Sequence, residues 1–519
     1  MAFDHNRRPR AVVIGAGVNG LAAAATLAAR GVDVTVVERG RGPGGMMTGA
    51  GQGELGHFVW NLHPAALAEL GLGAADLGLG AEVATVLLAA DGRHVVIEGE
   101  AISFADGTPH PDAAAYRALR ARLARFAAVL APLATAAPPR LGSGMLNRAG
   151  LSDLAQLART GLGLRRLPRD ARREFLRVLL SNAADLVRDE LPDGPLAASL
   201  VFDAILGGRA APGAPGTVLA LLWRHAGGGR RRPAGGMAAL ARRIAGAAEA
   251  RGVTIRYDAT AAGIEVEGDR VRGLRLGSGE VIAAEMVLSS LGAMPTLRLA
   301  GPAHFDAEAC RRIRGLRCEG TTARLDLRLA EMPRIEGLDG RLAGARLLLA
   351  PSVAAIEAAC RPVKYGAIPA SPVAEVLIEP GDGGAEGPAH LSALVQHVPY
   401  APECGWTEAA REALAAAVIG ALGTHMPGLP GLVTESRLAT PRDIETMTGA
   451  PGGHWHHAEL AADQMLTLRP VNGMARYASS LPGLWFCGAG AHPGGDITGL
   501  PGRNAALAAA ADLGQGVTR

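Results

Sequence analysis

The chain has 519 residues, a net charge of +3 and only 3% aromatic side chains, a basic excess too small and too scattered to indicate nucleic-acid binding. Its five cysteines are widely spaced and form no C-x-x-C pair, which excludes a disulfide framework and a zinc site and fits a reducing compartment. Neither a signal peptide nor a bilayer-spanning apolar stretch is evident, so we expect a cytoplasmic protein.

The first motif is a glycine-rich turn between a predicted strand and a predicted helix. Ala11–Ile14 is an apolar run of the length of a buried parallel strand, and residues 21–30 form an alanine-rich helix. Between them Gly15, Gly17 and Gly20 spell G-x-G-x-x-G, which permits a tight turn, close approach of a pyrophosphate and close helix–strand packing. This turn therefore predicts a dinucleotide site at the helix N-terminus.

A second predicted strand, residues 32–37, ends at Glu38. A carboxylate there accepts hydrogen bonds from both ribose hydroxyls and repels a 2′-phosphate. The glycine pattern alone does not separate NAD from FAD. Glu38 is followed by Gly44 and Gly45 in an E-x5-G-G pattern, and this extension resembles the FAD-binding domain of the amine oxidase and phytoene desaturase superfamily.

The segment from 111 to 190 is predominantly helical. Residues 116–134 place leucines and a phenylalanine on one face and arginines mostly on the others, and residues 165–180 repeat this pattern. Two interpretations stay open at this point: helices packed on their own domain, or basic helices that lie on a membrane surface.

Alternating apolar and polar residues predict strands in the second half of the chain. Residues 254–276 read as strands joined by a turn, and residues 321–329 as a half-buried antiparallel strand. Residues 374–380 and 390–399 read as further strands, and Thr407 begins a helix as its N-cap.

A second strand, glycine loop and helix lies at the other end of the chain. Leu484–Cys487 is a short apolar strand, Gly488 and Gly490 allow a tight turn, and residues 504–513 form an alanine-rich helix. The two ends of the chain can share one cofactor only if they meet in one domain.

This C-terminal segment resembles the FAD motif of phytoene desaturases. Residues 203–217, 233–237, 463–470 and 501–506 resemble one branch of that superfamily, the pyridine nucleotide-disulfide oxidoreductase domain-containing proteins of the second type and their bacterial relatives. The resemblance covers essentially the whole chain and implies FAD as the cofactor. The cofactor-binding positions that it implies are Gly15, Ala16, Gly17, Asn19, Gly20, Glu38, Arg39, Gly44, Gly45, Met46, Ala261, Gly488, Gly490, Pro493, Gly494, Gly495 and Asp496.

The sequence departs from the family pattern in two places. Met46 stands where many relatives have arginine or lysine, and Asp496 stands where glycine is usual. We expect the Asp496 carboxylate to form hydrogen bonds with ribityl hydroxyls or N–H groups.

Catalytic residues are not identified by any motif, and histidines are the candidates. The run His454–His457 can be interpreted as metal ligands, as a packed loop, or as histidines that orient substrate or move a proton; the family site is metal-free, and we expect no metal. The catalytic candidates are His456, His457 and His492.

The predicted fold class is α/β, with a Rossmann-like FAD-binding domain of the glutathione reductase type. We expect residues 1–75, 226–300 and 470–519 to form this domain. Residues 76–225 and 301–469 then form a discontinuous substrate domain of antiparallel sheet and helices, with its helical part at 111–190. No second G-x-G-x-x-G follows a strand, which argues against a separate NAD(P)H domain.

The resemblance implies an FAD-dependent dehydrogenase or desaturase that transfers hydride from a C–H bond of an apolar, isoprenoid-like or carotenoid-like substrate to the flavin. Electrons would then pass to a quinone, oxygen or a protein carrier. Open alternatives are an amine oxidase, a hydroxylating terpene dehydrogenase, and a non-catalytic FAD-stabilised partner subunit. The expected partners also include a peripheral membrane contact and a homo- or hetero-oligomer, but no nucleic acid.

Overall fold

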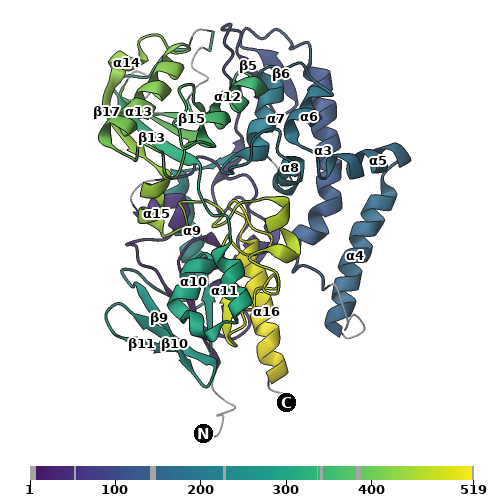
Figure 1. Ribbon diagram of the computed structural model, residues 1–519, viewed down its shortest axis with the longest axis vertical. Coiled ribbons are helices and arrows are strands. Elements are labelled where there is room, and N and C mark those ends of the chain that lie inside the picture. The colour runs from purple at the N-terminus through teal and green to yellow at the C-terminus, as the bar shows by residue number, and fades with distance from the viewer. Residues whose placement is uncertain are drawn as a thin grey trace.

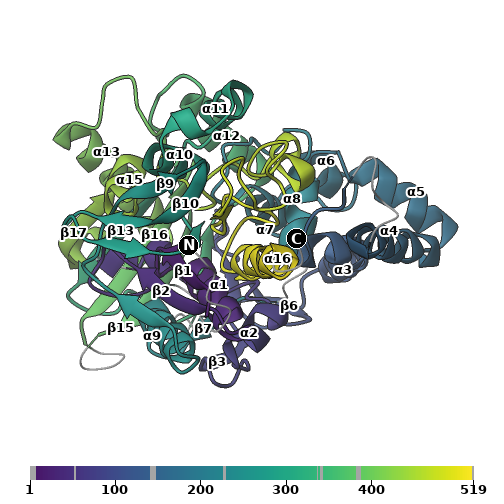
Figure 2. The same ribbon diagram turned by 90° about the horizontal axis from the view of Figure 1, so that it is seen from below.

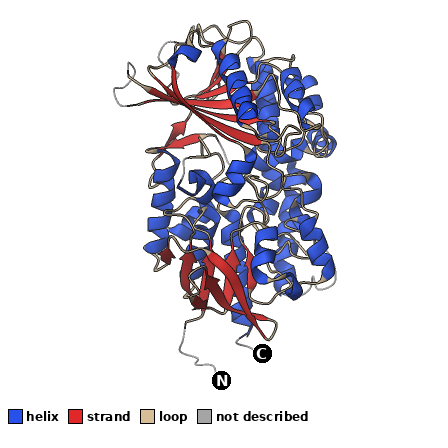
Figure 3. Ribbon diagram, turned by 60° about the vertical axis from the view of Figure 1, so that its left-hand side comes forward, coloured by secondary structure: helices blue, strands red, loops and turns tan. Residues whose placement is uncertain are grey.

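The computed structural model describes residues 8–51, 54–140, 148–225, 229–335, 337–338, 343–381 and 387–516. Strands gather at two ends of the molecule, with helices between and beside them (Figure 3). Both termini lie at the same end, and two helices, α4 (Arg148–Arg166) and α5 (Arg169–Val178), stand out from the body (Figure 1). Among the described residues, no helix is long and apolar enough to cross a bilayer.

The sheet near the termini has five strands and is parallel throughout. Its order is β18 (Leu484–Phe486), β12 (Met286–Ser289), β1 (Arg10–Ile14), β2 (Asp33–Val37) and β8 (Thr254–Arg256). Both faces of such a sheet are covered, which explains why β1 and β18 are continuous apolar runs. Strands from both ends of the chain therefore lie in one sheet, and the prediction of a Rossmann-like α/β fold is confirmed.

The two glycine loops meet at Ser290, the residue that follows β12. The Ser290 N–H and Oγ–H both donate to the carbonyl of Ile14, at 3.0 and 2.6 Å, which fixes the end of β1. On the other side, a Cβ added to Gly488 would overlap the carbonyl of Ser290. Glycine at 488 therefore lets the C-terminal loop pass directly over the end of β12.

Two helices, α1 (Val18–Ala28) and α16 (Leu500–Gly516), pack on the parallel sheet, and α9 (Gly236–Glu249) packs on α1. Figure 2 shows α16 beside α1. The helix predicted over residues 504–513 begins earlier, at Leu500, so the predicted start is wrong. Pro501 looks like a helix breaker in the sequence, but it lies in the first turn, where its missing N–H costs no hydrogen bond.

The larger sheet has eight strands and is antiparallel except for the β14–β4 pair. Its order is β17 (Val433–Ala439), β13 (Thr322–Leu329), β16 (Ala389–Gln396), β15 (Val373–Pro380), β14 (Arg346–Leu349), β4 (Thr85–Leu87), β5 (Val95–Glu98) and β6 (Ala101–Phe104). The predicted alternation of β13 is confirmed, because its leucines are buried in the core on one face. The opposite face, with Arg324 and Asp326, lies toward the rest of the molecule.

Helices cover one side of this sheet. The face of α3 (Ala113–Thr135) that carries Leu119, Leu123 and Phe126 is buried in the core, so this helix packs on its own domain. The other helices here are α6 (Ala183–Arg188), α7 (Pro195–Ile205), α8 (Thr217–His225) and α12 (Val353–Val363).

The remaining elements connect these layers. They are α2 (Pro64–Leu70), β3 (Leu79–Glu82), β7 (Arg231–Pro233), β9 (Ala261–Glu267), β10 (Arg270–Leu276), β11 (Val281–Ala283), α10 (Ala293–Ala300), α11 (Ala307–Arg314), α13 (Glu408–Gly423), α14 (Leu429–Leu432) and α15 (Pro441–Thr448). The N-cap of α13 is Thr407, as predicted, and its hydroxyl accepts from the N–H of Ala410.

The first glycine motif allows a sharp test of packing. A Cβ at Gly20 would overlap the carbonyl of Gly15, whereas a Cβ at Gly17 would meet no atom within 4 Å. We expect Gly20→Ala to lower the free energy of unfolding by about 1–3 kcal/mol through overpacking. Gly17→Ala should cost less than about 1 kcal/mol, the scale of a changed N-cap residue. Urea denaturation of both variants measures this, and equal losses would contradict the packing argument.

Candidate functional site

A cavity of about 500 Å³ lies at the carboxyl end of the parallel sheet and extends to the larger sheet. The N-terminal glycine motif and Ser290 line one end. At the other end are side chains of β15, β16 and the segment 55–61. Ligands of α/β proteins bind at this edge of a parallel sheet, so the cavity is the candidate site.

Most of the positions named from the sequence line this cavity. They are Gly15, Gly17, Asn19, Gly20, Glu38, Arg39, Gly44, Gly45, Met46, Ala261, His456, His457 and Asp496. The other positions do not line it, although each lies in one of the two glycine loops; they are Ala16, Gly488, Gly490, His492, Pro493, Gly494 and Gly495. The backbone of Gly494, for example, packs against the buried guanidinium of Arg469.

Glu38 closes the dinucleotide end of the cavity. Its Oε2 accepts from the N–H of Ala16 and its Oε1 from the N–H of Gly40, both at 2.8 Å. Each carboxylate oxygen keeps a second acceptor position, and two adjacent acceptors suit the two hydroxyls of a ribose. The side chain is therefore fixed before any ligand binds.

Gly17 marks where a ligand can approach the backbone. It is the N-cap of α1, and no acidic residue lies in the first turn of this helix, whose N–H groups favour an anion. Because a Cβ at Gly17 would enter open space, protein packing does not require glycine there. Glycine at this position instead keeps room for a pyrophosphate, so the residues present fit a dinucleotide.

Asp496 organises the opposite end of the cavity. Its carboxylate accepts from Asn61 Nδ2 and His456 Nε2, each at 3.0 Å, and forms an ion pair with Arg224 Nε at 3.3 Å. Burial raises the pKa of Asp496, but Arg224 and the His456 hydrogen bond outweigh this effect and hold the pKa below its usual range. The carboxylate therefore stays ionised and ties three segments together.

The candidate histidines differ in their surroundings. His456 and His457 line the cavity, and burial lowers the pKa of both, that of His457 to about 4. His492 lies away from the cavity, where its Nε2 donates to the carbonyl of Leu133 in α3 at 2.8 Å. Within the described part of the chain, no group of three or more His, Cys, Asp or Glu residues could hold a metal ion.

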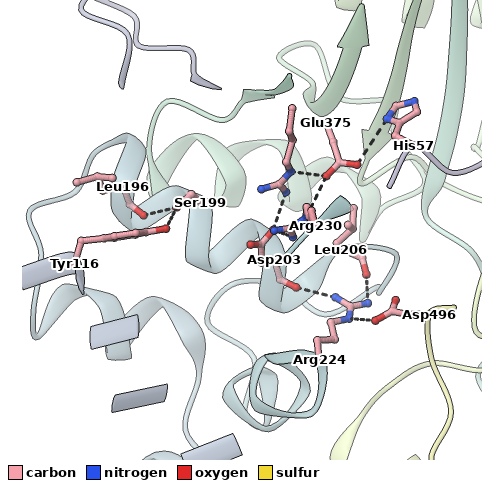
Figure 4. Close-up of polar contacts among 11 residues, drawn as sticks. His57, Tyr116, Leu196, Ser199, Asp203, Leu206, Arg224, Arg230, Glu375 and Asp496 are labelled. Atoms are coloured by element: carbon pink, nitrogen blue, oxygen red, sulfur yellow. Dashed lines mark hydrogen bonds and ion pairs between the residues drawn. The ribbon is translucent and has the colours of Figure 1, made fainter. Parts of the chain in front are cut away.

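A buried network of charges forms part of the far wall (Figure 4). Arg346 donates to Asp203 Oδ1 at 2.7 Å and to Glu375 Oε2 at 2.6 Å, and Arg230 donates to Asp203 Oδ1 at 2.5 Å. Two guanidinium groups thus balance two carboxylates. Burial raises the pKa of Glu375, but Arg346 and Arg230 outweigh it and keep the group ionised.

The network extends to the floor of the cavity through Arg224. Its Nη1 donates to the carbonyl of Asp203 at 2.7 Å and its Nη2 to that of Leu206 at 2.5 Å, while its Nε pairs with Asp496. One arginine of α8 therefore couples the end of α7 to the C-terminal loop. This coupling joins the two halves of the site.

Sequence reasoning missed the residues of the far wall. These are His57, Trp60, Asn61, Leu206, Arg230, Glu375, Leu394 and Trp455. A signal existed for Glu375, because a single acidic residue inside the apolar stretch 373–378 indicates a paired buried charge. The sequence gave no signal for Arg230, because the carboxylates that pair with it are distant in the chain.

Comparison with known proteins agrees with this geometry. A family model described as an NAD(P)-binding Rossmann-like domain matches residues 13–68. Pyridine nucleotide-disulfide oxidoreductase domain-containing protein 2 of Rattus norvegicus is 28% identical over 97% of this chain and 93% of its own length. Hydroxyneurosporene desaturase of Cereibacter sphaeroides is also 28% identical, over 97% of this chain and 98% of its own.

The chain is therefore similar to proteins of the phytoene desaturase and flavin amine oxidase superfamily, and its homologues include desaturases. Among solved structures, putrescine oxidase bound to putrescine has a TM-score of 0.56 at 14% identity, with 99% of this chain and 100% of that chain covered. At this identity the likeness shows the fold alone. The curated relatives named above support an oxidoreductase family for this chain.

Glu38 offers a direct test of the dinucleotide end. We expect Glu38→Ala to weaken FAD binding by about 1–3 kcal/mol, because charge-assisted hydrogen bonds to the ribose are lost. Titration of the apoprotein with FAD measures this change. Asp33→Ala is the matched control, since Asp33 is an exposed carboxylate at the other end of β2. Equal affinities of the Glu38 variant and the wild type would show that this carboxylate holds no ribose.

Proposed function

We propose that this protein is an FAD-dependent oxidoreductase that removes hydride from a C–H bond of an uncharged, largely apolar substrate and releases a desaturated product. The observation that supports this most strongly is one continuous cavity, in which a fitted dinucleotide cradle meets a wall of apolar and aromatic side chains and paired charges. When bound, FAD supplies the hydride acceptor.

In this proposal the chain holds the cofactor at both ends. Glu38 binds the adenosine ribose, and the N–H groups at Gly17 and the start of α1 bind the pyrophosphate. At the flavin end, Asp496 orients Asn61 and His456. The protein positions the reacting bond and excludes water, since the wall beyond the cradle includes Leu206, Leu394 and Trp455.

The charge balance of the far wall favours an uncharged substrate. Asp203 and Glu375 are paired with Arg230 and Arg346, so the network has no net charge for a substrate ion to neutralise. A charged amine or carboxylate placed there would leave one buried charge uncompensated, which is costly. This supports an apolar substrate, such as an isoprenoid, over an amine.

His456 is the residue best placed to take the proton that leaves with the hydride. Asp496 is ionised and only accepts hydrogen bonds, so His456 Nε2 carries the hydrogen and Nδ1 is the basic atom. Among the described residues, Nδ1 of His456 has no hydrogen-bond partner. Asp496 thus fixes the tautomer and His456 acts as the base.

The electrons taken from the substrate need an acceptor. They pass to a quinone, to oxygen or to a protein carrier. A non-catalytic, FAD-stabilised subunit is the competing function, and reduction of the bound flavin by a substrate distinguishes the two.

Anaerobic flavin bleaching tests the proposed function. We expect isoprenoid hydrocarbons in detergent micelles to bleach the flavin, and putrescine, NADH and NADPH to leave it oxidised on the catalytic timescale. His456→Gln should retain its FAD but lose roughly 10²–10⁴-fold in bleaching rate, the usual contribution of a general base.

Three results would count against the proposal. Rapid bleaching by NADH or NADPH would reveal a nucleotide site that the described residues do not show. Bleaching by the amine alone would assign the protein to the amine oxidases. Failure of every reductant except dithionite would favour the non-catalytic subunit.

A further inference from the structure

The two helices that stand out from the body, together with the residues next to them, expose several leucines. We call residues 151–180, which span most of α4 and all of α5, the helical arm. Four of its leucines are largely exposed: Leu151 at 56%, Leu162 at 48%, Leu176 at 60% and Leu180 at 64%. The rest of the described chain exposes only three other large hydrophobic side chains, Val281, Tyr365 and Leu468.

The exposed leucines of α4 follow the helical repeat. Leu151, Ala155, Ala158 and Leu162 are spaced by four, three and four residues, so they share one face, and all four are exposed. This spacing forms a continuous apolar stripe two turns and more in length, unlike the scattered single leucines of an ordinary surface.

The opposite face of α4, which is the buried one, contains polar side chains beside Leu164. Asp153 pairs with Arg476 at 3.1 Å, and Gln156 Nε2 donates to the carbonyl of Pro132 in α3 at 2.9 Å. Both side chains are buried. A helix adapted only to water would place its leucines inward and these polar groups outward, so the polarity of α4 is partly inverted.

Arginines flank the apolar stripe. The arm contains seven arginines and three carboxylates, a net charge of +4, while the whole chain carries +3 and the residues outside the arm therefore sum to −1. Arg159, Arg165, Arg166, Arg169 and Arg173 are exposed. The positive charge of this protein is thus concentrated where its exposed leucines are.

We propose that the helical arm is a docking surface for an anionic lipid bilayer. A bilayer interface has an apolar acyl-chain region beneath a layer of lipid phosphates. The exposed leucines suit the acyl-chain region, and the arginine side chains can reach the phosphates. A second copy of the chain is a poor occupant, because it would place one arginine-rich arm against another. α3 takes no part, since its apolar face is buried.

This proposal is independent of the reaction proposed above. It concerns a surface on the far side of α3 from the cavity, and lipid binding is measured without any turnover. Figure 2 shows α4 and α5 at one side of the molecule.

Vesicle flotation of the full-length, FAD-loaded protein tests the proposal. The vesicles are phosphatidylcholine alone or phosphatidylcholine with phosphatidylglycerol, each at low and at high salt. We expect binding to the phosphatidylglycerol vesicles at low salt, with loss of most binding at high salt and little binding to phosphatidylcholine alone.

Two arm variants separate the apolar and the electrostatic contributions. Replacement of Leu151, Leu162, Leu176 and Leu180 by serine should weaken binding by about tenfold or more, and so should Arg165→Gln, Arg166→Gln and Arg173→Gln combined. The matched control is Val281→Ser with Tyr365→Ser, which removes exposed hydrophobic side chains elsewhere and should bind like the wild type.

The outcomes that overturn the proposal are distinct. Absence of flotation with phosphatidylglycerol vesicles at low salt removes it, as does unchanged binding of both arm variants. Concentration-dependent dimerisation of the wild type that the leucine variant abolishes would assign the arm to an interface between copies. Flavin content and the melting temperature show whether each variant is folded. If the leucine variant does not fold, binding of the arginine variant alone tests the proposal.

Discussion

Ser290 follows the carboxyl end of strand β12, and two glycine loops from opposite ends of the chain contact it. One loop follows β1, whose last carbonyl accepts two hydrogen bonds from Ser290; the other passes over its carbonyl at Gly488. Because a larger residue at Gly488 would overlap this carbonyl, the loops can approach each other only through glycine. The cavity, its dinucleotide cradle and the position of Asp496 all depend on this junction.

The second organising feature is a balanced set of buried charges. Ion pairs in an interior are costly unless every partner is present, so Arg230, Arg346, Asp203 and Glu375 must be assembled together. Arg224 then extends this assembly to Asp496 and the C-terminal loop. These ion pairs therefore fix the position of the larger sheet relative to the cofactor cradle. The wall between them has no net charge.

The local parts of this structure could be predicted from the sequence. The glycine motif, Glu38 and the alternation of β13 depend on neighbours within a few residues, where propensity and spacing are informative. The charged wall could not be predicted from the sequence, because partners such as Asp203 and Arg346 are 143 residues apart. Helix polarity was equally hidden: α3 and α4 both combine leucine with arginine, and only packing shows that α3 buries its apolar face while α4 exposes an apolar stripe.

The central claim is that one FAD molecule joins both ends of the chain inside a single cavity. A crystal structure of the protein purified with its cofactor tests this most directly. The account predicts the adenosine ribose on Glu38, the pyrophosphate at Gly17, and the flavin ring between the Asp496–His456 pair and the wall of Arg230 and Trp60. A nicotinamide dinucleotide in the cradle, or a flavin ring outside this cavity, would contradict it.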